Sequence, residues 1–168
     1  MLIYDPTLDP YHCAIRILAI SENASISHLP LDSVRIAVFY LAYPSKVAEI
    51  RLPSNLVKIR KCARVLATPY RNPFDVKASF ERMYPIFHAA VLTLAAAGYI
   101  DSDRMRQGVI QRTDKAFPAD LSNVLQEFMG REREIREFIA RELTAIPLRG
   151  VDGLKHRSGL LEHRYDPS

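Results

Sequence analysis

The segment from residue 84 to residue 113 restricts the possible folds of this chain more than any other part of it. Its pattern predicts an apolar helix over Pro85–Ala97 that ends at Gly98, because glycine readily adopts the conformation that closes a helix. Two short strands are expected next, at Tyr99–Ile100 and Gly108–Gln111. A helix followed by a two-stranded hairpin forms the second half of a winged helix-turn-helix, a module that holds either DNA or another protein.

The helix and the loop of this segment carry further expectations. Residues 89–97 are small and apolar on every side, so we expect this part of the helix to lie buried at the centre of the core. His88 is then expected to be a core histidine rather than a ligand. Asp101 and Asp103, in the charged loop between the two strands, are expected to be turn residues.

Apolar residues at helical spacing predict several more helices. The expected ranges are Tyr11–Ser21, Ser33–Tyr43, Leu56–Ala67 and Val76–Tyr84. Asp32 and Asp75 each stand just before one of these ranges and are expected to cap the helix that follows.

A long helix is predicted over Pro118–Thr144, with apolar side chains along one side. A straight helix of this length would extend about 40 Å, further than a small winged-helix core. Phe128, Ile135 and Phe138 are therefore candidate contacts with a second copy of the chain or with another protein. Gly130 weakens the middle of this helix and is a candidate position for a bend.

The C-terminal segment, residues 150–168, combines glycines and basic side chains with apolar ones. Leucines need burial, so Leu154, Leu160, Leu161 and Tyr165 are candidates for docking on the chain's own domain or on a partner. The alternative is a mobile terminus that orders only in part.

The resulting fold class is mostly α with a small β-hairpin wing: a winged helix-turn-helix-like core plus a long C-terminal helix. A chain of 168 residues suits one domain with appended elements. The winged-helix-like domain is placed at residues 1–117, the long helix at 118–149 and the docking segment at 150–168.

Composition favours a cytoplasmic protein that does not contact a membrane. No apolar run approaches the ~20 residues that cross a bilayer, and the N-terminus lacks the positive region of a leader peptide. Cys13 and Cys62 stand far apart, so a disulfide framework is not expected.

No motif predicts an enzyme, and no cofactor or metal ion is expected. His12 and Cys13 are adjacent and would point in different directions on a helix, while His156 and His163 have no cysteine near them. The chain has no glycine-rich phosphate loop and no nucleophile–base pairing that the sequence makes visible.

The sequence supports nucleic-acid binding better than it supports catalysis or metal binding. The net charge is +4, and the basic residues are unevenly distributed along the chain. Candidate phosphate contacts lie in the helix after residue 57 and in the wing: Lys58, Arg60, Lys61, Arg64, Arg104, Arg106 and Arg112. The basic strip has a plainer explanation as a solvated helix face. Since residues 88–97 offer no basic or amide side chain, this helix cannot read bases, and any contact with double-stranded DNA should be non-specific.

The two ends of the chain carry a family resemblance. The opening motif is Tyr4-Asp5-Pro6-x-x-Asp9-Pro10-Tyr11-His12-Cys13-Ala14-x-Arg16, and the closing motif is Gly153-Leu154-Lys155-x-Arg157-Ser158-Gly159-Leu160-x-Glu162-x-Arg164-Tyr165-Asp166. Together they resemble the small middle components of bacterial ABC-three-component defence systems, a group that includes the Lamassu anti-phage and anti-plasmid systems.

The resemblance implies a winged-helix-type protein without catalytic residues, encoded beside an SMC/Rad50-like ATPase and an effector subunit that is often a nuclease. Such a protein would bind the ATPase, help hold the effector inactive, and couple recognition of foreign DNA to its release. The family supplies no functional residue at single positions. The main alternative is a free-standing winged-helix transcriptional regulator that binds DNA, and a small hydrolase is a third, less favoured possibility.

Overall fold

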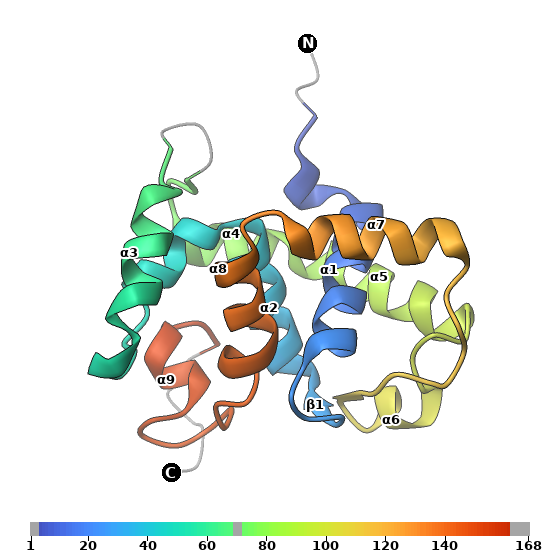
Figure 1. Ribbon diagram of the computed structural model, residues 1–168. Coiled ribbons are helices and arrows are strands. Elements are labelled where there is room, and N and C mark those ends of the chain that lie inside the picture. Colours follow the sequence, from blue (N-terminus) through green and yellow to red (C-terminus); the bar gives the residue numbers. More distant parts are fainter. Residues whose placement is uncertain (1–3, 69–71, 162–168) are drawn as a thin grey trace.

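Helix α1, Pro10–Asn23, runs through the middle of the molecule (Figure 1). The computed structural model describes residues 4–68 and 72–161. Apolar side chains cover most sides of α1, so it can pack against α2 (Leu31–Ala42), α5 (Tyr84–Ala96) and α7 (Ala119–Gly130) together. Asp9 caps its first turn by accepting hydrogen bonds from the amides of residues 11 and 12.

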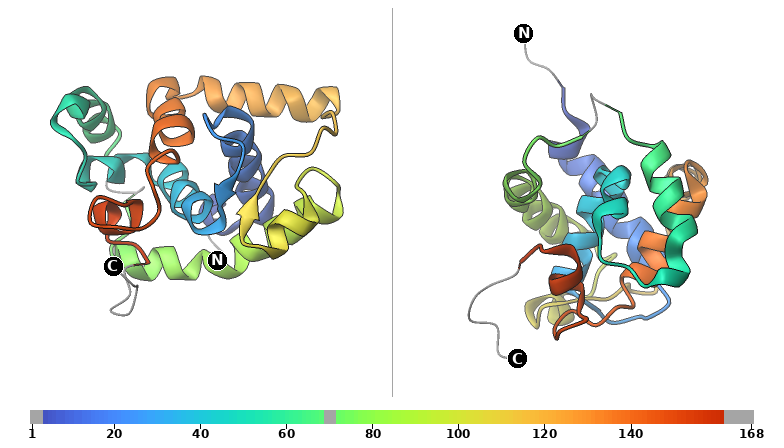
Figure 2. Two further views of the ribbon diagram at one scale, coloured as in Figure 1. Left: turned by 90° about the horizontal axis from the view of Figure 1, so that it is seen from below. Right: turned by 90° about the vertical axis from the view of Figure 1, so that its left-hand side faces the viewer.

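The helices form three layers (Figure 2). Helices α1 and α2 make the middle layer; α5 and the short α4, Val76–Arg82, cover one side. The opposite side carries α3 (Val57–Val65), α7 and α8 (Arg133–Phe138). The short elements are η1 Pro6–Leu8, η2 Pro44–Glu49, η3 Ser54–Leu56, α6 Ser102–Arg106, the π-helix η4 Ile139–Leu143 and α9 Leu154–Ser158.

A small antiparallel β-element confirms the predicted class, mostly α with a wing. Strand β2, Val109–Ile110, pairs with β1, Leu29–Pro30, an early segment that the sequence pattern did not identify as a strand. The predicted partner of β2, residues 99–100, joins through a single bridge from Ile100 to Arg112. The charged loop between them is a helix, α6, because the Asp101 carboxylate accepts from the amide of residue 104 and starts a helical turn.

Helix α5 is half exposed, so the expectation of a fully buried helix is wrong. Its buried side faces α1, while its other side lies at the surface. His88 is exposed and its ring stacks on Tyr84, with 5.9 Å between the ring centroids, so it is not a core histidine. The expectation of burial came from the small apolar residues, which leave this helix without a polar side in the sequence. In the fold, other helices cover only one side of α5.

The single helix expected over residues 118–144 is broken. Helix α7 ends at Gly130, and Glu132 takes a left-handed backbone conformation with φ of 46° before α8 begins. The Arg136 guanidinium fastens this bend: it donates to the Phe128 carbonyl at 2.9 Å and lies 4.0 Å from the centre of the Phe128 ring. The bend turns Ile135 and Phe138 into the core, whereas a straight helix would leave the three-layered body.

The C-terminal segment packs on the chain's own domain as far as it is described. Leu154 and Leu160 are buried, and Lys155 reaches Asp32 of α2 at 4.0 Å. Gly153 is required there, since a Cβ at this position would collide with the backbone carbonyl of residue 149. Tyr165 lies outside the described residues.

One of the two predicted caps is confirmed. The Asp75 carboxylate accepts from the amide of residue 78 at the start of α4. Asp32 is not a cap, because α2 already begins at Leu31, directly after Pro30.

Candidate interaction surfaces

Helix α3 exposes most of the predicted basic strip. Its buried residues Ile59 and Ala63 face the core, where α3 contacts η2 and α8, and the turn-by-turn spacing then leaves Lys58, Lys61 and Arg64 exposed. Lys58 is paired with Glu134 of α8 at 2.7 Å, and this contact raises the pKa of Lys58 and lowers the pKa of Glu134.

Arg60 does not belong to this exposed set. It is half-buried and donates to the Leu52 carbonyl at 2.8 Å, which fastens the chain before α3. Among the described residues of the strip, Lys61 and Arg64 have neither an ion-pair partner nor a side-chain hydrogen bond, so they are the cations available to a phosphate.

The wing arginines have different surroundings. Arg104 is exposed, and Arg106 is exposed and paired with Asp103 at 2.9 Å, within α6. Arg112 is instead part of the structure's internal network, which corrects its assignment to the phosphate-binding set.

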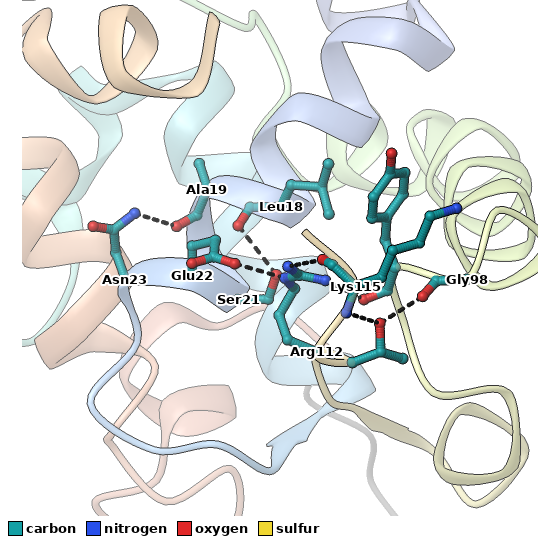
Figure 3. A network of polar contacts seen from close by, with 10 residues as sticks. Leu18, Ala19, Ser21, Glu22, Asn23, Gly98, Arg112 and Lys115 are labelled. Carbon is teal, nitrogen blue, oxygen red and sulfur yellow. Dashed lines mark hydrogen bonds and ion pairs between the residues drawn. The ribbon is translucent and has the colours of Figure 1, made fainter. Parts of the chain in front are cut away.

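The Arg112 guanidinium joins three parts of the chain (Figure 3). Its Nε donates to Glu22 of α1 at 2.7 Å, and its other nitrogens donate to the carbonyls of Tyr99 and Lys115 at 2.7 and 3.0 Å. It also lies 4.2 Å from the centre of the Phe117 ring. All these contacts leave little of the guanidinium for an outside ligand, so Arg112 positions the wing against α1.

The candidate partner-binding residues are mostly inside the molecule. Four of them are buried in this chain's own core: Ile135, Phe138, Leu154 and Leu160. Phe128 and Leu161 are half-buried and pack against that core. Four of the six described candidates are therefore not accessible to a partner while this fold is intact, and the sequence pattern identified core residues here rather than a surface.

The exposed side of α5 is a surface that the sequence reasoning missed. It carries no charged side chain over the whole helix; its exposed positions are Tyr84, Pro85, His88, Ala89, Leu92, Thr93, Ala96 and Ala97. Helices α5 and α3, which carry this face and the basic residues, lie on opposite sides of the middle layer (Figure 2). The sequence does contain a sign of this surface. Tyr84, His88 and Leu92 are spaced four residues apart, which places them on one side of the helix.

Two buried arginines also escaped the sequence analysis, and they differ in their partners. Arg35 of α2 is paired with Glu81 at 3.2 Å and lies between the Phe80 and Tyr84 rings, 4.1 and 4.6 Å from their centres. Arg16 of α1 is buried with its Nε and one terminal nitrogen unbonded, and burial lowers its pKa. A buried charge without hydrogen bonds destabilises a fold, so Arg16 is a weak point of the core.

We therefore expect Arg16→Met to raise the free energy of unfolding by about 1 kcal/mol, because methionine fills a similar volume without a charge. The matched variant Arg35→Met should lower it instead, since it removes an ion pair and two ring contacts. Urea denaturation followed by circular dichroism measures both. A loss of stability in Arg16→Met would contradict the assignment of Arg16 as an unsatisfied charge.

The described residues offer little for covalent or metal chemistry. Burial raises the pKa of the Cys13 thiol to about 11, and burial together with Glu134 raises that of Cys62, which disfavours the reactive thiolate. Within residues 4–68 and 72–161, no group of three or more His, Cys, Asp or Glu side chains could hold a metal ion. No helix in the same ranges is long and apolar enough to cross a bilayer.

One hollow of about 520 Å³ lies between η3 and the C-terminal segment. Leu56, Phe138 and Ile146 contribute apolar walls, and Arg157 stands at its edge. The Arg157 guanidinium is already bound to Asp152 and to the Arg51 carbonyl, at 3.3 and 2.6 Å, so it fastens the C-terminal segment.

Comparison with known proteins gives one match. The model of the family described as ABC-three component (ABC-3C) system Middle Component 5 matches residues 2–166. The matched range includes both end motifs of the sequence. No curated protein and no solved structure gives a significant match.

Proposed function

Because this chain belongs to the Middle Component 5 family of ABC-three-component systems, which are anti-phage defence systems, we propose that it is a non-catalytic subunit that links an SMC/Rad50-like ATPase to a nuclease-type effector. In this role it binds both components and helps to keep the effector inactive until foreign DNA, from a phage or a plasmid, is recognised. A Lamassu-like arrangement of the complex is part of the same proposal.

The observation that carries this proposal is the pair of chemically different surfaces on opposite sides of the molecule. The exposed face of α5 is uncharged, and α3 on the far side is basic. A subunit that joins two other molecules needs two separate surfaces, and the difference in charge lets each surface select its own partner.

Purification from the native operon tests the proposal. Tagged protein should retain a large coiled-coil ATPase, with or without a nuclease, and mass spectrometry identifies the retained chains. Recovery of this protein alone, under conditions where the neighbouring proteins are expressed, would contradict the linking role.

Contact with DNA through phosphates is part of this proposal and has its own test. The double variant Lys61→Glu, Arg64→Glu should weaken binding to double-stranded DNA equally for unrelated sequences. The slope of log affinity against log salt should become shallower by about 2, which corresponds to two lost phosphate contacts. Fluorescence anisotropy at several salt concentrations measures both quantities.

A matched control is the variant Lys77→Glu, Arg82→Glu, which reverses two exposed charges of α4 on the other side of the molecule. It should leave the salt slope unchanged. An unchanged slope in the α3 variant would remove this helix from the DNA interface.

The alternative is a free-standing winged-helix regulator. Part of the element order favours it: α1, β1, α2, α5 and the 100–112 bridge occur in the order helix, strand, helix, helix and wing, although η2, η3, α3 and α4 are inserted between α2 and α5. The uncharged face of α5 weighs against it, because that helix would have to enter the major groove. Binding of the isolated protein to one DNA sequence in preference to others would favour the regulator.

A further inference from the structure

The exposed side of α5 forms one continuous face along the helix. Its members recur at positions i, i+1, i+4 and i+5, which keeps them in line over successive turns. Tyr84 and Leu92, the two large apolar members, are 45% and 47% exposed. The Thr93 hydroxyl donates a hydrogen bond to the Ala89 carbonyl at 2.9 Å. Its hydrogen is therefore already used within the helix, and the methyl group of Thr93 adds to the apolar part of the face.

Exposure to solvent does not account for a helix face without charged side chains. A surface helix normally turns charged side chains to the solvent, as α3 of this chain does with Lys58, Lys61 and Arg64. DNA does not explain it either, since the face has no cation for phosphates. Alanines at positions 89 and 96 would instead let the axis of a second helix approach to the short end of the usual 8–10 Å.

Cations stand at both ends of this face. Arg82 is exposed before its start, and Arg104 and Lys115 are exposed after its end. Lys115 is held there, because its ammonium donates to the Ala97 carbonyl at 2.6 Å.

Two of the neighbouring acids are already paired within the chain. Glu81 bonds to Arg35, and Asp103 bonds to Arg106; Asp114 is exposed and has no such pair. The positive charge at the ends therefore outweighs the free negative charge and favours acidic groups on whatever covers the face.

A second copy of the chain fits poorly. In an antiparallel pair of α5 helices, Arg82 would face the partner copy's Arg104 and Lys115; in a parallel pair, each cation would face itself. A helix of this length is about 20 Å long and about 10 Å wide, so it offers about 200 Å² per side. A stable dimer needs about 800 Å² per partner.

We propose that the uncharged face of α5 is the docking surface for an amphipathic helix of another component of the defence complex, one whose apolar stripe is bordered by acidic side chains. This inference rests on the proposed function, because it needs a complex in which other contacts supply the remaining interface area. The partner helix lies along α5, its apolar side chains contact Leu92 and Tyr84, and its acids meet the cations at the ends.

Photo-crosslinking in the intact complex tests this placement. The photoreactive residue p-benzoylphenylalanine replaces Leu92 in tagged protein expressed from the native operon, and the complex is irradiated after purification. The crosslinked peptide should come from another component and should show apolar residues at helical spacing with Asp or Glu beside them. The same residue in place of Asn123, exposed on α7 on the opposite side, is the control and should not crosslink to that peptide.

Two variants measure the strength of the contact. Leu92→Glu should weaken association with the crosslinked component at least about tenfold, without loss of helicity, because the side chain is half exposed. Arg82→Glu with Arg104→Glu should also weaken it, and this effect should shrink at high salt. The charge-matched pair Lys61→Glu, Arg64→Glu on α3 should leave it unchanged.

The outcomes separate the two proposals. An intact complex without a crosslink from position 92, a crosslink to a second copy or to DNA, or a crosslinked peptide bordered by basic residues would overturn the docking inference and leave the linking role standing. Failure to retain any other component would overturn the linking role, and the docking inference with it.

Discussion

Replacing Leu154 with alanine is expected to lower the free energy of unfolding by about 3 kcal/mol. The leucine side chain has 0% exposure and is part of the single large core cluster, so its removal leaves a cavity that the surrounding helices fill only in part. The backbone around it is also fixed, since the amides of residues 154 and 155 donate to the carbonyls of residues 147 and 148. Such a backbone has little freedom to collapse into the space.

Urea denaturation followed by far-ultraviolet circular dichroism measures this effect. Val151→Ala is the matched control from the same segment: Val151 is 80% exposed, so the change should stay within about 0.5 kcal/mol.

This experiment also decides between the two docking hypotheses for the C-terminal segment. If Leu154 belongs to the chain's own core, Leu154→Ala lowers the stability of the protein. Any loss of partner binding then follows from unfolding. Unchanged stability together with lost assembly of the complex would contradict the placement of Leu154 in the chain's own core.

Replacing Arg112 with alanine is expected to lower the free energy of unfolding by about 2 kcal/mol. The change removes an ion pair with Glu22 and the hydrogen bonds to the carbonyls of Tyr99 and Lys115. The Tyr99 carbonyl keeps the Thr113 amide as a donor, whereas the Lys115 carbonyl loses its side-chain donor. The change also removes the contact with the Phe117 ring. Arg112→Lys keeps the charge but not the planar fork of donors, so it should recover only part of the loss.

Thermal and urea unfolding of both variants provide the measurement, with Arg104→Ala as the control. Arg104 is exposed on the same wing, and its truncation should change stability by no more than about 0.5 kcal/mol. If Arg112→Ala were as stable as the unaltered protein and lost only DNA binding, Arg112 would be a phosphate contact after all.

The phosphate-binding set shows where the residue pattern was insufficient. The pattern placed Lys58, Lys61 and Arg64 on one exposed face of α3, as the structure does, because charge and helical spacing are local properties. Their contact with phosphates stays a prediction. It did not separate Arg60 and Arg112, which bond to carbonyls of the chain, from Lys61 and Arg64, which do not. An arginine's partners depend on which distant backbone lies within reach, and this is a property of the folded chain.

The sequence by itself determined the positions of helices α1 to α5, the α5 stop at Gly98, the small wing and the family, since each depends on neighbouring residues or on a whole-chain pattern. Only the tertiary structure decided which apolar sides are covered. The stripe over residues 118–144 and the leucines of the C-terminal segment were equally suited to a partner or to the chain's own core, and the bend at Glu132 directed Ile135 and Phe138 inward. Helix α5 had the composition of a buried helix, yet the chain supplies a packing layer on one side of it only. Apolar side chains specify that burial is favourable, but the surface that buries them depends on which elements the whole fold brings beside them.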